Sequence, residues 1–270
     1  MVGSFILMKL FLETLTEERS ALRPLYPNRL KFIATSAAIF CHITPQWYTS
    51  IMSNIKLLIA SANDKFTISQ ISSIEKAAEL AEKFISKNFD FNYEVNVIVV
   101  PNQYLFNIIP EDGISGRTYK SDMIVISVNT ELEIPEDFFY ETLCHELSHS
   151  IRWKKVPERS ITLFENIILE GLAIILEEKA MTDEKKNNSQ YFLKEMQKTN
   201  KVTIDKILSV LENNLDDITY DYNKIFIDGD ENFPRWSGYR LGYYFVKKHL
   251  QDKNININKA TLESYKKFSK

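Results

Sequence analysis

The chain has 270 residues, 44% of them hydrophobic, which suffices to bury a full core in one large domain or two small ones. Its net charge of −3 provides no basic field, so we expect no nucleic acid as a partner. Its two cysteines, Cys41 and Cys144, do not make a disulfide framework, and no uncharged run of about 18 residues predicts a membrane span.

The first 65 residues are expected to be mainly helical, with breaks at Pro24, Pro27 and Pro45. The apolar start, residues 1–12, lacks both a basic leading segment and a small-residue cleavage site, so it does not have the features of a signal peptide. We therefore expect a cytoplasmic, reducing location. Frequent Ile, Lys and Asn indicate an AT-rich bacterial coding genome.

The next part of the chain predicts one helix and two strands. Apolar residues recur at helical spacing over residues 68–89, which predicts an amphipathic helix. Residues 93–100 are rich in β-branched side chains and predict a strand. Residues 111–116 have the composition of a turn, and residues 117–129 then enter a second strand.

A helix that begins at Pro135 is the most informative element of the sequence. Proline and the two acidic residues that follow it suit a helix first turn, because the missing N–H costs nothing there and negative charge faces the positive end of the dipole. The apolar face of this helix consists of Tyr140, Leu143, Cys144, Leu147 and Ile151. A catalytic role for Cys144 with the adjacent histidine is disfavoured, because neighbouring helix positions point apart.

Residues 145–149 of this helix read His-Glu-Leu-Ser-His, the H-E-x-x-H pattern of zinc-dependent hydrolases. Residues four apart lie on one face of a helix, so the imidazoles of His145 and His149 can converge on one cation. Glu146 points about a quarter-turn away, where its carboxylate can reach a metal-bound water instead of the metal. Half of the four histidines fall in this pentapeptide, so we favour a metal site over two unrelated histidines.

A catalytic zinc site needs a third protein ligand and keeps a fourth position for water. The metzincin class would require Gly and His where this chain has Arg152 and Lys155, so it is excluded. A glutamate from a following helix is the other common solution. The apolar segment 160–178, with Ser160 as its expected N-cap, is such a helix.

Glu170 is the predicted third ligand, because a lone carboxylate among apolar neighbours is costly to bury without a partner. Glu165 and Glu177 remain as less favoured alternatives. Gly171 supports the choice: glycine inside a helix costs about 1 kcal/mol relative to alanine, so a packing reason is expected. We expect that it lets this helix approach the histidine helix closely.

Three more helices are predicted over residues 202–214, 237–250 and 258–268. They follow a charged surface loop that begins at residue 182. His249, near the end of the second of these helices, is expected at the surface.

The pairing of H-E-L-S-H with a downstream Glu-Gly-Leu-Ala resembles gluzincin metallopeptidases, and more narrowly the bacterial predicted zinc-dependent proteases with that second motif. The likeness covers roughly residues 90–250 and includes the segment 236–243. It implies an α+β fold, mostly helical, with a small mixed β-sheet packed beside the zinc-binding helix. It also implies Glu146 as the general base and one zinc ion per chain, bound by His145, His149 and Glu170.

The chain departs from the thermolysin-like pattern in one respect. Those relatives place an aspartate four residues after the glutamate ligand, whereas this chain has Ile174. The group that orients the ligands must therefore come from elsewhere, and Glu141, one turn before His145, is the candidate. Tyr239, or an arginine near it, is the candidate that stabilises the oxyanion, with a tyrosine ring packed in the core as the equal alternative.

In the gluzincins that this chain resembles, substrate backbone adds to the edge strand beside the zinc helix. Gly113 and Gly116 would leave backbone accessible at such an edge, although a plain hairpin turn explains them equally well.

We divide the chain into a mainly helical region, residues 1–90, and a zinc metallopeptidase region, residues 91–270, or treat both as one continuous domain. The expected function is hydrolysis of a peptide or protein substrate by a zinc-activated water, with Glu146 as general base. The alternative is a non-catalytic metal-binding or interaction protein that retains the fold. The intact Glu146 argues against that alternative, because a structural zinc site needs no general base.

Overall fold

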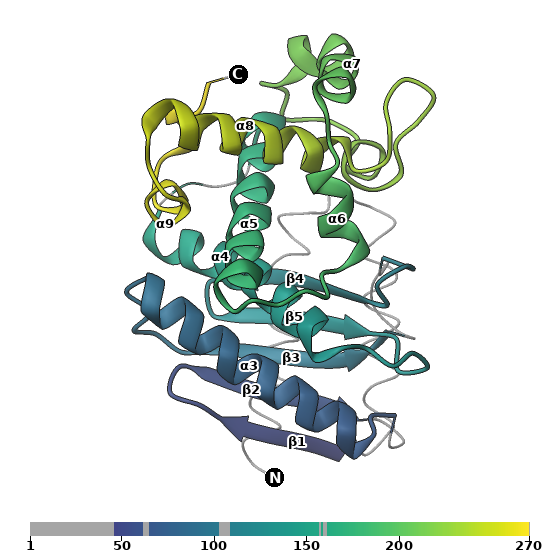
Figure 1. Ribbon diagram of the computed structural model, residues 1–270, viewed down its shortest axis with the longest axis vertical. Helices are drawn as coiled ribbons and strands as arrows, with labels where there is room; N and C mark the ends of the chain where they lie inside the picture. The colour runs from purple at the N-terminus through teal and green to yellow at the C-terminus, as the bar shows by residue number, and fades with distance from the viewer. Residues whose placement is uncertain (1–45, 62–64, 103–108, 157, 159–160, 270) are drawn as a thin grey trace.

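The computed structural model describes residues 46–61, 65–102, 109–156, 158 and 161–269 (Figure 1). The predicted helical breaks at Pro24, Pro27 and Pro45, the residue Cys41 and the expected Ser160 cap lie outside these described residues.

The described strands form one mixed sheet in the order β1-β2-β3-β5-β4. Its middle strands, β2, β3 and β5, run parallel, and the two edge strands are antiparallel to their neighbours. In chain order the strands are β1 (Gln46–Ile51), β2 (Ile55–Ser61), β3 (Val95–Pro101), β4 (Ile114–Lys120) and β5 (Met123–Val128). The predicted strand over residues 93–100 is confirmed as β3. The segment 117–129, predicted to enter one strand, belongs to two antiparallel strands: β4 ends at Lys120, and β5, the strand expected just before the H-E-x-x-H helix, begins at Met123.

The helical prediction for residues 46–61 is wrong, because this segment forms β1 and β2. Parallel strands buried on both faces have nearly continuous apolar runs, and periodicity cannot distinguish a short run of this kind from a buried helix. Strand β2 is such a run. The proposed division at residue 90 stays a prediction, and the sheet continues across it through the pairing of β2 with β3.

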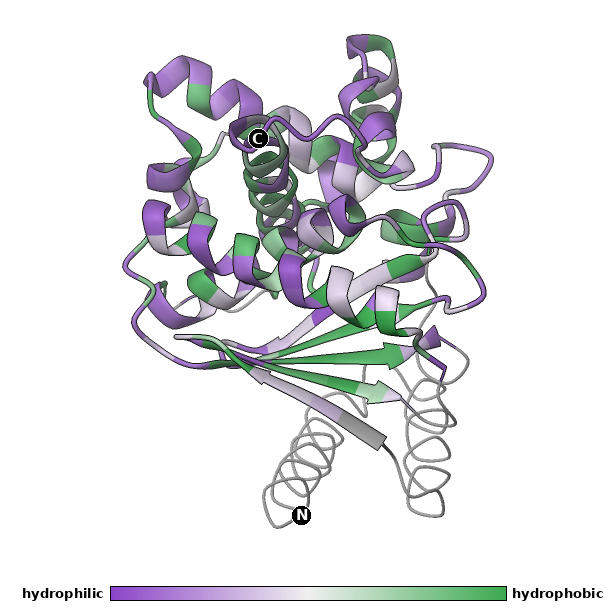
Figure 2. Ribbon diagram, turned by 60° about the horizontal axis from the view of Figure 1, so that its bottom comes forward, coloured by the Kyte–Doolittle hydropathy of each residue, from purple (hydrophilic) through white to green (hydrophobic). Residues whose placement is uncertain are grey.

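The described helices lie on one side of the sheet (Figure 2). Helices α3 (Ile68–Asn88) and α4 (Glu136–Lys155) pack side by side, and α4 also contacts β4 and β5. Helix α5 (Leu163–Asp183) packs on α4, and α8 (Ser237–Lys253) packs in turn on α5. The remaining elements are α6 (Tyr191–Gln197), α7 (Lys201–Leu211), η3 (Glu212–Asn214), η4 (Asn223–Asp228), α9 (Ile257–Thr261) and η5 (Tyr265–Lys267).

The main core lies between the sheet and these helices. The predicted apolar face of α4 is confirmed, since each of its five members is no more than 3% exposed. Helix α5 begins after Thr162, which forms a capping box with Glu165. The α+β class, mostly helical with a small mixed sheet beside the H-E-x-x-H helix, is confirmed.

Helices α5 and α8 meet through a pair of glycines. A Cβ atom on Gly171 would lie under 3.0 Å from the backbone of Gly242, and a Cβ atom on Gly242 would lie 2.8 Å from the Gly171 nitrogen. The close approach expected at Gly171 therefore exists, but its partner is α8 and not the histidine helix. Two backbones this close leave no room for any side chain at the crossing.

The C-terminal part differs from two expectations. The helix predicted over residues 258–268 is two short pieces, α9 and η5. His249 is buried, not at the surface: it is 5% exposed, its Nε2 lies 2.8 Å from Glu263, and its ring stacks on Phe268. Among the described residues, no helix combines the length and apolarity needed to cross a membrane.

Candidate metal centre

The two histidines and Glu170 come together between α4 and α5. The Nε2 atom of His145 lies 3.3 Å from Glu170 Oε2, and the Nε2 atom of His149 lies 3.4 Å from the same oxygen. The ligand atoms of all three side chains lie within 4.8 Å of one another. Tyr140 contacts Ala180, whereas His149 contacts Glu170, so α4 and α5 run in opposite directions.

The donor set fits a zinc ion. Two imidazole nitrogens and one carboxylate oxygen are common zinc ligands in catalytic sites, which leave one position open. The Glu170 side chain is only 12% exposed. Burial alone raises the pKa of this carboxyl, but the charges and hydrogen bonds of His149 and His145 outweigh burial and lower it to about 2. A buried carboxylate that must stay ionised between two imidazoles is what a cation site requires.

Glu177 holds the other side of the His145 ring. Its Oε2 lies 2.7 Å from His145 Nδ1, so Nε2 is turned toward Glu170. Burial lowers the pKa of the His145 imidazole, but the charge of Glu177 and hydrogen bonds to Glu170 and Glu177 outweigh it and raise the pKa well above its usual value. Glu177 therefore occupies the orienting position, two turns after Glu170 on α5, and not the ligand position considered for it.

The expectation that Glu141 orients a ligand is wrong. Its Oε2 accepts the backbone N–H of Gln190 at 3.0 Å and so anchors the loop before α6 on α4. The signal that sequence reasoning missed is the spacing of seven residues between Glu170 and Glu177, which puts both on one face of α5. Which of several buried glutamates reaches the ring depends on how two helices cross.

Glu146 is buried against the edge strand β4. It is 5% exposed, and Thr118 Oγ1 lies 2.7 Å from its Oε2 and 2.9 Å from its backbone oxygen. Gly116 faces the same side chain from the same strand. Neither Thr118 nor Gly116 was predicted to contact Glu146, because a contact between a strand and a helix leaves no local mark in the sequence.

The two glycines of the expected turn lie in different elements: Gly113 in the turn and Gly116 in strand β4. Gly113 has a φ of +66°, is buried, and its carbonyl accepts the N–H of Asn129. Its backbone is therefore used internally and is not accessible, contrary to the expectation. Gly116 lies within β4, so the turn ends before residue 114.

Tyr239 lies in the first turn of α8. Its ring is partly buried and packs edge-to-face on Phe192 and Phe226, with centroid distances of 5.1 and 5.4 Å. Burial, the charge of Glu170, and the charge and hydrogen bond of Tyr222 raise the pKa of the phenol well above its usual value. The ring of Tyr239 thus packs in the core, which was one of the two alternatives, and its role as oxyanion stabiliser stays a prediction.

The arginines near Tyr239 are engaged elsewhere. Arg240 donates to the carbonyl of Glu195 at 2.9 Å, and Arg235 pairs with Glu111 at 2.9 Å. Cys144 is fully buried, and burial raises the pKa of its thiol, as expected for a core residue.

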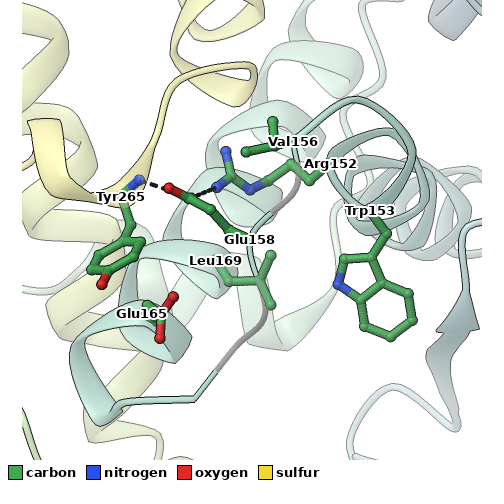
Figure 3. A pocket seen from close by; sticks show the side chains of 7 residues that line it. All are labelled: Arg152, Trp153, Val156, Glu158, Glu165, Leu169 and Tyr265. Atoms are coloured by element: carbon green, nitrogen blue, oxygen red, sulfur yellow. Dashed lines mark hydrogen bonds and ion pairs between the residues drawn. The ribbon is translucent and has the colours of Figure 1, made fainter.

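A separate hollow, partly open to solvent, lies where α4 ends and α5 begins (Figure 3). Its lining residues are Arg152, Trp153, Val156, Glu158, Glu165, Leu169 and Tyr265. Figure 3 shows Arg152 and Glu158 pointing toward each other, and Glu158 also accepts the N–H of Tyr265 at 3.0 Å. Arg152 and Glu158 thus pair with each other, and Glu165 accepts the N–H of Thr162. None of the three candidate ligands lines the hollow.

A mostly helical α+β fold, with H-E-x-x-H on one helix and a glutamate on the next, defines a zinc-metallopeptidase-like class. The family model described as "Predicted Zn-dependent protease (DUF2268)" matches residues 72–270. The chain therefore belongs to this family, as the resemblance of its motifs predicts.

Other comparisons add little. No curated protein matches the chain. Among solved structures, it is similar to an aminopeptidase N family protein from Idiomarina loihiensis, with a TM-score of 0.48 and 12% identity. That match covers 83% of this chain and 41% of the other, so the chain spans less than half of that protein's length.

Proposed function

We propose that this protein is a zinc-dependent peptidase whose metal ligands are His145, His149 and Glu170. The observation that carries the proposal is the convergence of both Nε2 atoms on one oxygen of Glu170. One zinc ion per chain would be held there. When bound, it supplies a Lewis acid that lowers the pKa of a water molecule and polarises a carbonyl oxygen.

The protein's own groups would handle the protons. Glu146 takes a proton from the attacking water and returns it to the leaving amine nitrogen. Tyr239 donates a hydrogen bond to the oxygen that becomes negative when the peptide carbonyl is attacked. The phenol is protonated, and therefore a donor, at neutral pH, and its raised pKa keeps it so.

A peptide is the substrate that the edge of the sheet suits best. Strand β4 is an edge strand and packs on α4, the helix that carries Glu146. In this proposal a peptide lies extended beside β4, with its scissile bond next to Glu146. The family's description as proteases agrees with a peptide substrate.

The alternative is a metal-binding protein without turnover. A structural zinc site has no use for a buried carboxylate beside its ligands and fills its fourth position with another protein group. Glu146 therefore favours the peptidase.

Elemental analysis and a peptide-library assay test the proposal on the unaltered protein, Glu146→Gln and Glu170→Ala. We expect about one zinc per chain in the unaltered protein and in Glu146→Gln, less in Glu170→Ala, and turnover only in the unaltered protein. Zinc without turnover in the unaltered protein would support the non-catalytic alternative. Failure to bind zinc after reconstitution would contradict both.

A further inference from the structure

We propose that strand β4 positions the Glu146 carboxylate, with Thr118 holding one oxygen and Gly116 leaving room for the other. This pair of residues is called the carboxylate seat below. The inference rests on the proposed function, since it assigns positioning residues to the proposed general base.

Thr118 holds Oε2 of Glu146. Its hydroxyl has one hydrogen and two acceptors in reach, the carboxylate at 2.7 Å and the Glu146 carbonyl at 2.9 Å. The carbonyl lies within α4 and already accepts a helical N–H, whereas a carboxylate forms the stronger, charge-assisted hydrogen bond. The threonine is itself fixed, because it is 9% exposed, its χ1 is stiff, and its backbone pairs with Ile124 of β5.

Gly116 leaves the space that the other half of the carboxylate fills. It lies two residues before Thr118 and therefore faces the same side of the strand. A Cβ atom there would lie nearest to the Cγ atom of Glu146, 2.6 Å from its Oε1 and 2.7 Å from its Cδ, distances at which one group must move. The backbone of Gly116 is not left-handed, so alanine would fit its conformation, and space is the reason for glycine.

The seat determines which oxygen does the chemistry. Because Oε2 accepts the Thr118 hydrogen, Oε1 is the oxygen left to take the proton of the attacking water. A misplacement of about 1 Å at such a position can cost about 100-fold in rate. Alanine at position 116 would displace the Glu146 side chain from Cγ outward, and zinc content and melting temperature show whether the metal ligands and the fold remain.

The test uses the zinc-loaded full chain with Thr118→Val, Thr118→Ser and Gly116→Ala, and measures zinc content, melting temperature, kcat and KM. Thr261→Val is the matched control, because Thr261 is also buried and its hydroxyl donates to a carbonyl, that of Ile257. We expect Thr118→Val and Gly116→Ala to keep zinc and lose about 10- to 100-fold in kcat with little change in KM. Thr118→Ser should recover most of kcat, and Thr261→Val should leave it unchanged.

Normal kcat in Thr118→Val and Gly116→Ala would overturn the seat. A loss of kcat that accompanies a loss of zinc, and that Thr118→Ser does not recover, would also overturn it. Crystal structures of the two zinc-loaded variants test the seat without turnover, since the Glu146 carboxylate must leave its place in both. If it stays, the seat is refuted; if it moves and the unaltered protein binds zinc without turnover, only the proposed function fails.

Discussion

The glycine contact between α5 and α8 predicts a loss of both stability and turnover on Gly242→Ala. The added Cβ atom would lie 2.8 Å from the Gly171 nitrogen and nearer still to the Ile167 carbonyl, where 3.4 Å is an ordinary contact. Both neighbours are backbone, so the helices must separate by roughly 1 Å. Such overpacking costs about 1–3 kcal/mol. Contact with backbone on two sides places this change in the upper part of that range, about 2–3 kcal/mol, and the better helix propensity of alanine offsets about 1 kcal/mol of it.

The expected net loss is about 1–2 kcal/mol in the free energy of unfolding, which lowers the melting temperature by about 2–8 °C in a chain of this size. Turnover should fall further than stability explains. Tyr239 lies one turn before Gly242 on α8, so separating the helices moves it away from α5, the helix that carries Glu170. A displacement of about 1 Å can cost about 100-fold in kcat.

Urea unfolding gives the stability, and kcat is measured well below the melting temperature. Lys248→Ala, an exposed change on the same helix, is the control and should alter neither quantity. A Gly242→Ala protein as stable as the unaltered one would refute the argument from close contact. Lower stability with unchanged kcat would refute only the placement of Tyr239 by this crossing.

Three further predictions concern the surroundings of the site. Glu177→Gln should weaken zinc binding about 10- to 100-fold, because it weakens the hydrogen bond that orients the His145 ring. A chelator competition titration measures the zinc affinity, and an unchanged affinity would contradict the prediction. The pKa of His145 is raised, so the metal-free protein holds a proton on this imidazole at neutral pH. Zinc must displace this proton, and zinc affinity should therefore increase as the pH rises through the pKa of His145. Calorimetry in buffers of different ionisation enthalpy should detect the released proton, and identical heats in all buffers would exclude it. Arg152→Met should lower the free energy of unfolding by about 3 kcal/mol, because the carbonyls of Thr261 and Glu263 lose a buried donor. Urea unfolding measures this loss. A urea midpoint equal to that of the unaltered protein would show that these hydrogen bonds contribute nothing.

The sequence predicts best where the chemistry is local. The H-E-x-x-H helix could be recognised because its first turn, its apolar face and its paired histidines all follow from spacing along one helix. Glu170 could be found because an isolated carboxylate in an apolar run needs a partner. These predictions required no knowledge of how distant segments meet.

The rest depends on how elements cross. Glu177 and Glu141 are both buried beside the site, and only the angle between α4 and α5 decides that Glu177 reaches His145. Gly171 does mark a close approach, but the sequence does not show which helix approaches. Thr118 contacts Glu146 across 28 residues of chain, through a contact made only once β4 lies against α4.

The burial of acidic groups around His145 has a consequence for the abundance of this protein in a cell. Burial first, and then the charge of Glu177, raises the pKa of the Glu141 carboxyl, and burial raises that of Glu177. A chain that folds without a cation must therefore hold protons on these groups or bear their repulsion, whereas a bound ion adds its binding energy to the folded state. Copies made when zinc is scarce would open more often and be degraded sooner. The amount of this protein, and not only its activity, would then follow the supply of zinc.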